Sequence, residues 1–477
     1  MSSRRLAPQR GDGRSRRHAA RASPATLRAV DPTASSGDRH RVVGVVGATG
    51  VIVAAIVGAG IFAQTGQFGA TVVSPLNLIA PWVLGGFVAL CGGLSLAELG
   101  AMIPCSGGSV EFARRAYGKT IGYLTATVTL LAGYLLAIAV VALFLASFVD
   151  KLFEADVPDH AIALAAIAAA FVSQVPGLRA GYAFNTALSV LKVGFVAVFA
   201  VAGLLVPVGD RMEAPAEVAA NAPGLFSSAV ASATLAVSFA YLGWSTGADI
   251  AGDIARPGRN IPRAIIASIG IVFVLYIGVN FAYLRVIDPA AMVEPDGKPM
   301  QAIGSVAATL LFGEAIGRAM TAVIALLLFS TIVSGLITSA RICESMAHAG
   351  EIPAWAGVRR ANGVPLRALV LMTVLSAAML AIGPLGEILD LLTVLIAVFS
   401  SLSVAAVIVL RRTMPDAPRP FRVPLYPLTP IAYLAIAAWG IVSSVVAGGL
   451  RAVASSLIAI AVLFALRPLL RNRRSAA

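Results

Sequence analysis

Val57-Gly58-Ala59-Gly60-Ile61-Phe62 places two glycines in the middle of an apolar stretch that is otherwise typical of a membrane-spanning helix. Glycine in a helix interior costs about 1 kcal/mol relative to alanine. In hydrocarbon, any backbone group that such a break frees must find another partner. Broken helices at membrane depth occur where they are buried in protein or line a cavity. This stretch therefore predicts a broken helix with a binding site near the middle of the membrane.

The composition is that of a polytopic membrane protein. Of the 477 residues, 58% are hydrophobic and 12% are charged, whereas soluble domains carry about 25% charged residues. The net charge of +13 does not indicate nucleic-acid binding, because ten arginines lie in the first 41 residues and most others lie in alternate loops. The three cysteines and four histidines show no metal-ligand spacing, so we expect free thiols, no metal and no cofactor.

A membrane-spanning helix needs about 20 apolar residues, and the chain contains twelve such stretches. If the N-terminus is inside, nineteen Lys and Arg residues fall in inner loops and six in outer loops. This asymmetry predicts a plasma-membrane protein with both termini in the cytoplasm. The expected spans are residues 42–68, 79–102, 120–149, 160–175, 185–207, 226–251, 264–286, 316–346, 366–384, 388–410, 428–447 and 450–468.

The two ends of the chain are expected to lie outside the membrane. Residues 1–41 lack the apolar core of a signal peptide and predict a disordered basic tail that lies on anionic lipid. Their composition resembles a transit peptide apart from three aspartates. Residues 469–477 predict a short cytoplasmic tail.

The sixth span is also interrupted, since Ser238–Gly247 places glycines and small polar residues at mid-depth. Paired breaks at corresponding positions of two halves indicate a transporter site. We therefore expect two five-helix repeats of opposite orientation, residues 42–207 and 226–410, followed by two further helices at 428–468. The alternative for either break is close helix packing through small residues.

The two breaks together suit a zwitterion such as an amino acid. The N–H groups of the first break, at the start of a new helix, favour a carboxylate. The carbonyls of the second break would accept hydrogen bonds from an ammonium group. The expected substrate-binding residues are Gly58, Ala59, Gly60, Ile61, Ala240, Tyr241, Gly243, Trp244 and Ser245.

At these residues the chain resembles the amino acid–polyamine–organocation (APC) transporter superfamily, over about residues 42–470. Four patterns carry the resemblance: Gly58 to Phe62; Ala97-Glu98-Leu99-Gly100 with Pro104, Gly107, Gly108 and Ser109; Phe239 to Pro262; and Ser339-Ala340-Arg341 with Met346-Ala347 and Gly350 to Pro353. The resemblance implies an all-α membrane protein with twelve helices, a LeuT-type 5+5 inverted repeat and two additional helices. Ser245, Asp249 and Asp253 depart from residues common in the family, which leaves the substrate side chain open.

Two ionisable residues within the spans are expected to couple transport to an ion, since charges at membrane depth are costly. The resemblance implies that Lys192 occupies the place of a sodium ion between the first break and span 8. The alternative is a lysine that reaches to the inner surface. Asp249 either binds a cationic substrate, carries a proton or pairs with a cytoplasmic arginine.

Further residues are candidates for gating or for contact with Lys192. Tyr241 and Trp244 are either gates over the ligand or packing residues. Glu98 and Glu111 are expected to form ion pairs at the inner gate, and polar residues of span 8 are candidates to face Lys192. These polar residues are Ser330, Thr331 and Ser334.

The resulting hypothesis is a secondary transporter that moves amino acids or related amines by proton symport. Amine or amino acid exchange is the first alternative, and a non-transporting membrane sensor is the second. A phosphate-binding G-x-x-x-x-G-K-[ST] loop is absent from the sequence, which argues against ATP hydrolysis. No repeated charge ring indicates a channel, and histidines outside the span centres argue against a membrane enzyme. The partners expected are substrate, proton and lipid, while oligomeric state stays open.

Overall fold

The computed structural model describes residues 43–448 except 59, 106–107, 154–156, 176–177, 215, 220, 252–253, 295, 349, 359 and 361–363. Within these residues the secondary structure is helical, and β-pairing is limited to isolated bridges. Ala59, Asp253, the two tails and the twelfth expected span lie outside the described residues.

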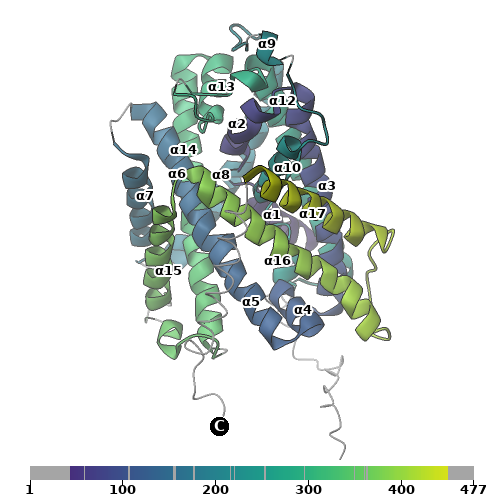
Figure 1. Ribbon diagram of the computed structural model, residues 1–477. Coiled ribbons are helices and arrows are strands. Elements are labelled where there is room, and N and C mark those ends of the chain that lie inside the picture. Colours follow the sequence, from purple (N-terminus) through teal and green to yellow (C-terminus); the bar gives the residue numbers. More distant parts are fainter. Residues whose placement is uncertain are drawn as a thin grey trace, which may run out of the picture. The chain divides into compact units, whose positions relative to one another are not determined.

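The first half of the described chain contains the first broken helix and four elements that correspond to the next expected spans (Figure 1). Its helices are α1 (Val45–Ile56), α2 (Gly60–Val72), α3 (Pro75–Met102), α4 (Gly108–Tyr117), α5 (Lys119–Leu130), the π-helical turn η2 (Leu131–Leu136), α6 (Ala137–Phe153), α7 (Asp159–Gln174) and α8 (Leu178–Leu205).

The second half begins with a short helix and then repeats the pattern of a broken helix followed by long ones. Its helices are α9 (Ala216–Ala219), α10 (Ser228–Ala240), α11 (Thr246–Asp249), α12 (Pro257–Val286), η3 (Pro289–Ala291), α13 (Ile303–Phe312), α14 (Glu314–His348), η4 (Ala354–Gly357), α15 (Leu366–Met379), η5 (Leu380–Ile382), α16 (Leu385–Thr413) and α17 (Leu428–Gly448).

Each of the first eleven expected spans coincides with one helix or with a run of consecutive helices. By length and composition, six helices of the described residues can cross a membrane, or seven if the bent pair α1 and α2 forms one span. The helices α4 and α13 were not expected as separate elements. Each has only ten residues, which is too short for a membrane span.

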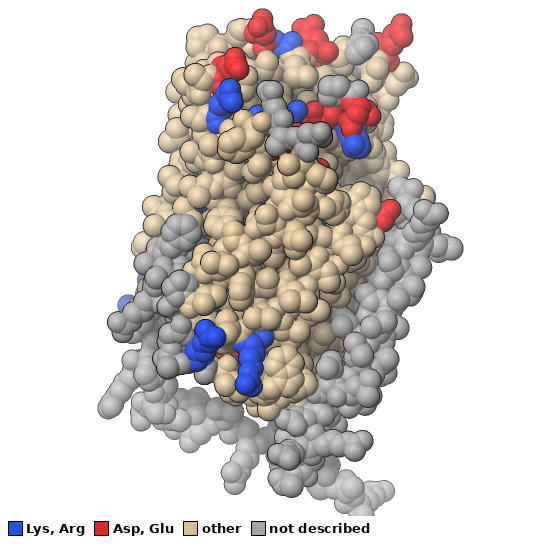
Figure 2. Space-filling view, turned by 90° about the vertical axis from the view of Figure 1, so that its left-hand side faces the viewer, with Lys and Arg blue, Asp and Glu red and all other residues tan. Residues whose placement is uncertain are grey.

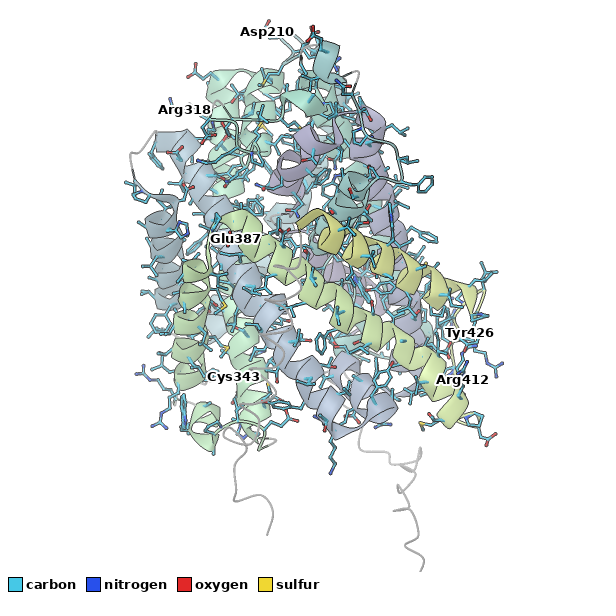
Figure 3. All side chains as sticks on the ribbon, in the orientation of Figure 1. Asp210, Arg318, Cys343, Glu387, Arg412 and Tyr426 are labelled. Carbon is cyan, nitrogen blue, oxygen red and sulfur yellow. The ribbon has the colours of Figure 1, made fainter. Side chains whose placement is uncertain are left out.

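Charged side chains lie at the two ends of the helices. Figure 2 shows a wide band of uncharged residues that separates most charged groups of that face into two sets. We call these the α4 end and the α13 end, after the helices that lie there in Figure 1. Arg412 and Tyr426 lie near the α4 end, and Asp210 and Arg318 lie at the α13 end (Figure 3). The band matches what a hydrocarbon layer requires.

Glycines bring α3 close to the second broken span. A Cβ on Gly85 would lie 2.8 Å from the Val237 side chain, and a Cβ on Gly93 would lie 2.7 Å from Ile265. Small residues permit close helix approach in membranes, where packing drives association. The helix α3 therefore packs closely against α10 and α12.

The Glu98 carboxylate is fully buried on α3 and bonds to the end of α16. It accepts hydrogen bonds from Arg411 Nε at 2.8 Å, Arg411 Nη2 at 2.5 Å and the Val423 N–H at 2.7 Å. Glu111 pairs with Arg115 on its own helix at 2.8 Å. Both glutamates thus form ion pairs at the α4 end, and the buried pair fixes α3 against α16.

Candidate functional site

The two breaks touch each other in a reciprocal way. The first helix bends by 41° between α1 and α2, and a Cβ on Gly60 would lie 2.5 Å from the Ala240 Cβ. Gly243 has φ +120°, and a Cβ there would lie 2.8 Å from the Ala55 carbonyl carbon. Each break therefore uses a glycine to approach the backbone or Cβ of the other broken helix.

The Tyr276 hydroxyl of α12 lies between the two breaks. It is 3.1 Å from the Ile56 carbonyl oxygen and 3.1 Å from the Ala240 carbonyl oxygen. These carbonyls end α1 and α10, where helix termini leave acceptors without helical partners. A hydroxyl carries a single proton to donate, so only one of the two carbonyls is fully satisfied by Tyr276 at a time.

A cavity of about 1210 Å³ lies beside the joined breaks. This volume is above the roughly 300–1,000 Å³ typical of ligand pockets. Its wall includes most of the residues that the sequence predicted for substrate binding and coupling. These are Gly58, Gly60, Ala240, Gly243, Trp244, Ser245, Lys192 and Asp249.

The cavity extends from the breaks toward the α4 end. Val46 at the start of α1, Ser109 of α4 and Thr338 of α14 all line it. From α2 only Gly60 contributes, and most of that helix is buried. The same asymmetry holds in the second broken span, where residues of α11 line the cavity and α10 is mainly buried. The site is thus accessible from one end.

Gly58 and Gly60 differ in what surrounds them. Gly60 is in close contact with Ala240, whereas a Cβ on Gly58 would meet only Ile56 O at 3.8 Å and the Thr331 methyl carbon at 4.0 Å. Gly58 is therefore not needed for helix packing. The room above it faces the cavity beside the N-terminus of α2, where the helix dipole favours an anion.

Lys192 is buried on α8, with 3% of its surface exposed. Its ammonium group donates a hydrogen bond of 3.0 Å to the Thr331 hydroxyl of α14. Thr331 is also the residue nearest to the space above Gly58 apart from the break itself. Lys192 thus contacts span 8 close to the first break.

Asp249 ends α11 and bonds to α4 across the cavity wall. One carboxylate oxygen accepts hydrogen bonds from the Ser109 hydroxyl at 2.8 Å and the Ser109 N–H at 3.1 Å. Among the described residues, Asp249 forms no ion pair with an arginine.

The aromatic residues of the second break face different ways. Trp244 lines the cavity and packs edge-on against Tyr433, with ring centroids 6.0 Å apart. Tyr241 does not line it: its ring packs against Trp82 and Tyr276, and its hydroxyl donates to the Trp82 carbonyl at 3.2 Å. Ile61 is also fully buried away from the cavity. The geometry favours the packing alternative for Tyr241.

Sequence reasoning missed two contributors to the site. Tyr276 lies in an ordinary apolar span, and only its position among helices reveals its bond to both breaks. The π-helical turn η2 interrupts span 3 and brings Gly133 and Tyr134 to the cavity wall. Single π-turns in α-helices often occur at functional sites. The sequence signal for this turn is Gly133, a glycine in the middle of span 3.

The site contains no metal-binding cluster in the part of the chain that is described. No group of three or more His, Cys, Asp or Glu residues lies close enough there to hold a metal ion. The polar groups at the breaks include the carbonyl oxygens of Ile56 and Ala240, which lie near the Tyr276 hydroxyl.

Two broken helices that meet at a cavity of this kind define the class of membrane transporters. The chain belongs to the amino acid permease family, whose model matches residues 43–466. The relatives found are amino acid transporters and not enzymes.

Three relatives illustrate the range of similarity. The serine/threonine exchanger of Bacillus subtilis (strain 168) is 27% identical over 82% of this chain and 88% of its own length. The large neutral amino acids transporter small subunit 2 of Homo sapiens is 29% identical over 85% of this chain and 76% of its own. The Asc-type amino acid transporter 1 of Mus musculus is 27% identical over 84% of this chain and 76% of its own length.

Proposed function

We propose that this protein carries amino acids or related amines across the plasma membrane by alternating access. The observation that carries the proposal is the cavity at the joined breaks, which reaches the α4 end while α2 and α10 are buried. A carrier needs a central site that communicates with one side at a time. The arrangement fits one of the two states such a carrier must have.

The architecture that we propose has twelve spans, with residues 42–207 and 226–410 as inverted five-helix repeats. Its support is the reciprocity of the breaks, since Gly60 approaches Ala240 and Gly243 approaches Ala55. Two repeats related by an axis in the membrane plane would produce such paired contacts.

We further propose that the α4 end faces the cytoplasm. The helix ends there carry Arg114, Arg115, Lys119 and Arg412, and positions close to the cytoplasmic ends of spans are enriched in Lys and Arg. The cavity is then the inward-facing one. Both termini would lie on the same side as the cavity mouth.

The substrate is proposed to bind as a zwitterion across the two breaks. Its carboxylate would lie above Gly58, at the N-terminus of α2, because helix N-termini favour anions. Its ammonium group would donate to whichever of the Ile56 and Ala240 carbonyls Tyr276 leaves free. Trp244 would cover the ligand from the second break.

Proton symport is our first hypothesis for coupling, with Lys192 as the group involved. A buried ammonium group whose described contact is one hydroxyl is costly, and its protonation would influence the adjoining break. Exchange is the second hypothesis, and the printed name of the Bacillus subtilis relative, an exchanger, favours it.

Reconstitution of the full chain into proteoliposomes tests the function. We expect uptake of labelled amino acids that is inhibited by unlabelled ones. Uptake that needs an inward proton gradient indicates symport, whereas uptake that needs preloaded amino acid indicates exchange. If no amino acid or amine competes for uptake or raises thermal stability, the proposed function is wrong.

The role of Lys192 is tested by Lys192→Ala in the same vesicles. We expect loss of coupled uptake, because the variant removes the cation beside the first break. Lys151→Ala is the matched control, since Lys151 pairs with Glu294 at a partly exposed position. Equal uptake by Lys192→Ala and wild type would exclude the coupling role.

A further inference from the structure

The cavity wall contains one fixed acidic group that zwitterion binding at the breaks does not use. Among its described lining residues, Lys192 and Asp249 are the only members of the Lys, Arg, Asp and Glu types. Lys192 lies by the first break, whereas Asp249 lies at the end of α11 toward the α4 end. The two opposite charges thus occupy different parts of the wall.

The Asp249 carboxylate is held by neutral donors. They are the Ser109 N–H at 3.1 Å and the Ser109 hydroxyl at 2.8 Å. Such hydrogen bonds stabilise an ionised carboxylate without cancelling its charge. Tyr134 of η2 is the other titratable residue of this part of the wall. With no ion-pair partner among the described residues, this carboxylate is the acidic group that the cavity wall offers to a ligand.

The spacing places this carboxylate about one long side chain from the end of the second break. Ser245 lies at the end of the second break, and Asp249 follows it by four residues, with the Asp249 N–H bonded to the Ser245 carbonyl at 3.1 Å. Four residues of helix advance about 6 Å. A side chain of three or four methylene groups attached to a ligand at the breaks spans a similar length.

We propose that Asp249 forms a cation subsite of the transport cavity, which binds a side-chain ammonium group such as that of ornithine or lysine. The inference rests on the proposed function, because it assumes that the α-amino and carboxylate groups bind at the breaks. The ammonium group would donate to the Asp249 carboxylate in a charge-assisted hydrogen bond. Cationic amino acids would then be preferred over neutral amino acids of equal length.

Matched ligand pairs test this subsite directly. Lysine and norleucine differ at the chain end, where one carries an ammonium group and the other a methyl group, and ornithine and norvaline form a second pair. We expect unlabelled lysine to inhibit uptake by the reconstituted wild-type protein at about tenfold lower concentration than norleucine. In Asp249→Asn, the two inhibition constants should become equal through weaker lysine binding.

Two further variants test whether the effect depends on the position of the Asp249 carboxylate. Asp249→Glu keeps the charge but extends it by one methylene group, so ornithine should gain relative to lysine. Asp296→Asn is the matched control, because Asp296 is an exposed carboxylate that pairs with Lys298, and it should leave both inhibition constants unchanged. Thermal unfolding of each purified variant without ligand reports whether it is folded.

The outcomes separate the two proposals. Inhibition by norleucine that equals or exceeds inhibition by lysine in the wild type overturns the cation subsite and leaves the proposed function standing. A lysine preference that persists unchanged in folded Asp249→Asn also overturns it. If none of the four amino acids inhibits uptake or raises thermal stability, the proposed function fails and the subsite fails with it.

Discussion

The two halves of the first broken span differ in what they contact. In α2, ten of thirteen residues are buried, whereas in α1 only four of twelve are. The exposed residues of α1, such as Val46 and Val51, line the cavity. We call α2 the closed half of this span and α1 the open half. Both helices are apolar, so their different exposure to the cavity follows from how neighbouring helices pack around each of them.

The closed half is held by specific contacts from α12 and from the segment before α13. Tyr283 donates to the Ile61 carbonyl at 3.1 Å, and Thr65 donates to Asn280 at 2.7 Å. Gly66 lies directly against the Met300 carbonyl, with no room for a Cβ. The open half has fewer such ties: the Ser268 hydroxyl lies 3.1 Å from the Thr49 carbonyl. To open the closed half, these hydrogen bonds must break.

The largest effect is expected where the halves meet, in Gly243→Ala. The residue has φ +120°, and a Cβ would lie 2.8 Å from the Ala55 backbone. Strain and overpacking together should cost about 2–5 kcal/mol. Thermal unfolding of the purified protein should show a large loss of stability, together with loss of uptake.

The control for this variant is Gly50→Ala in the open half. A Cβ on Gly50 meets nothing within 4 Å, and alanine favours the helix by up to about 1 kcal/mol. Gly50→Ala should therefore be as stable as the wild type or more stable. If Gly243→Ala and Gly50→Ala lose equal thermal stability, the contact between the breaks is not the reason that Gly243 is needed.

The second prediction compares thiol access to the two halves. In a background with Cys91, Cys105 and Cys343 replaced by alanine, Val51→Cys should react rapidly with a small charged maleimide. Ala63→Cys should react about 10²-fold more slowly, because Ala63 is fully buried and exposure requires local opening of about 3 kcal/mol. Reaction rates in detergent measure the ratio, and similar rates would contradict the one-sided cavity.

Much of this arrangement was predictable because it depends on local residue types. Glycines at mid-span in spans 1 and 6 predict helix breaks directly. In the structure α1 ends at Ile56 and α2 begins at Gly60, while α10 ends at Ala240 and α11 begins at Thr246. The alternation of basic and acidic loops likewise depends on composition alone. These features need no knowledge of how one helix is rotated against another.

The remaining features of the site depend on how each helix is rotated and on which distant residues it meets, and sequence patterns do not contain this information. Tyr241 and Trp244 are three positions apart in irregular backbone, yet one packs against Trp82 and the other lines the cavity. Tyr276 reads as one more aromatic residue of an apolar helix until the structure brings it to both breaks. The partner of Asp249 was left open because Ser109 is 140 residues away.

The third prediction concerns the hydroxyl that joins the breaks, removed in Tyr276→Phe. Two buried carbonyls, of Ile56 and Ala240, then lose their shared donor, which should cost about 1–3 kcal/mol. Substrate affinity should fall about tenfold as well, because the breaks are no longer held in register. Thermal unfolding and inhibition constants measure the two effects.

Tyr283→Phe is the matched control, since Tyr283 is also fully buried on α12 and bonds to one carbonyl of α2. It should lower stability by a similar amount but leave substrate affinity near the wild-type value. If the two variants weaken substrate binding equally, Tyr276 has no special role in aligning the breaks.

The smallest effect is expected from removal of one hydroxyl in each half. Thr65→Val deletes the donor to the Asn280 side chain in the closed half, which leaves a buried amide oxygen without that bond and should cost about 1 kcal/mol. Thr49→Val deletes a hydroxyl that bonds only to the Val45 carbonyl of its own helix, beside the cavity, and should change stability by less than about 0.5 kcal/mol. Because the two substitutions are chemically identical, the difference between their unfolding midpoints isolates the environment. A larger loss for Thr49→Val would mean that α1, and not α2, is the half held by specific contacts.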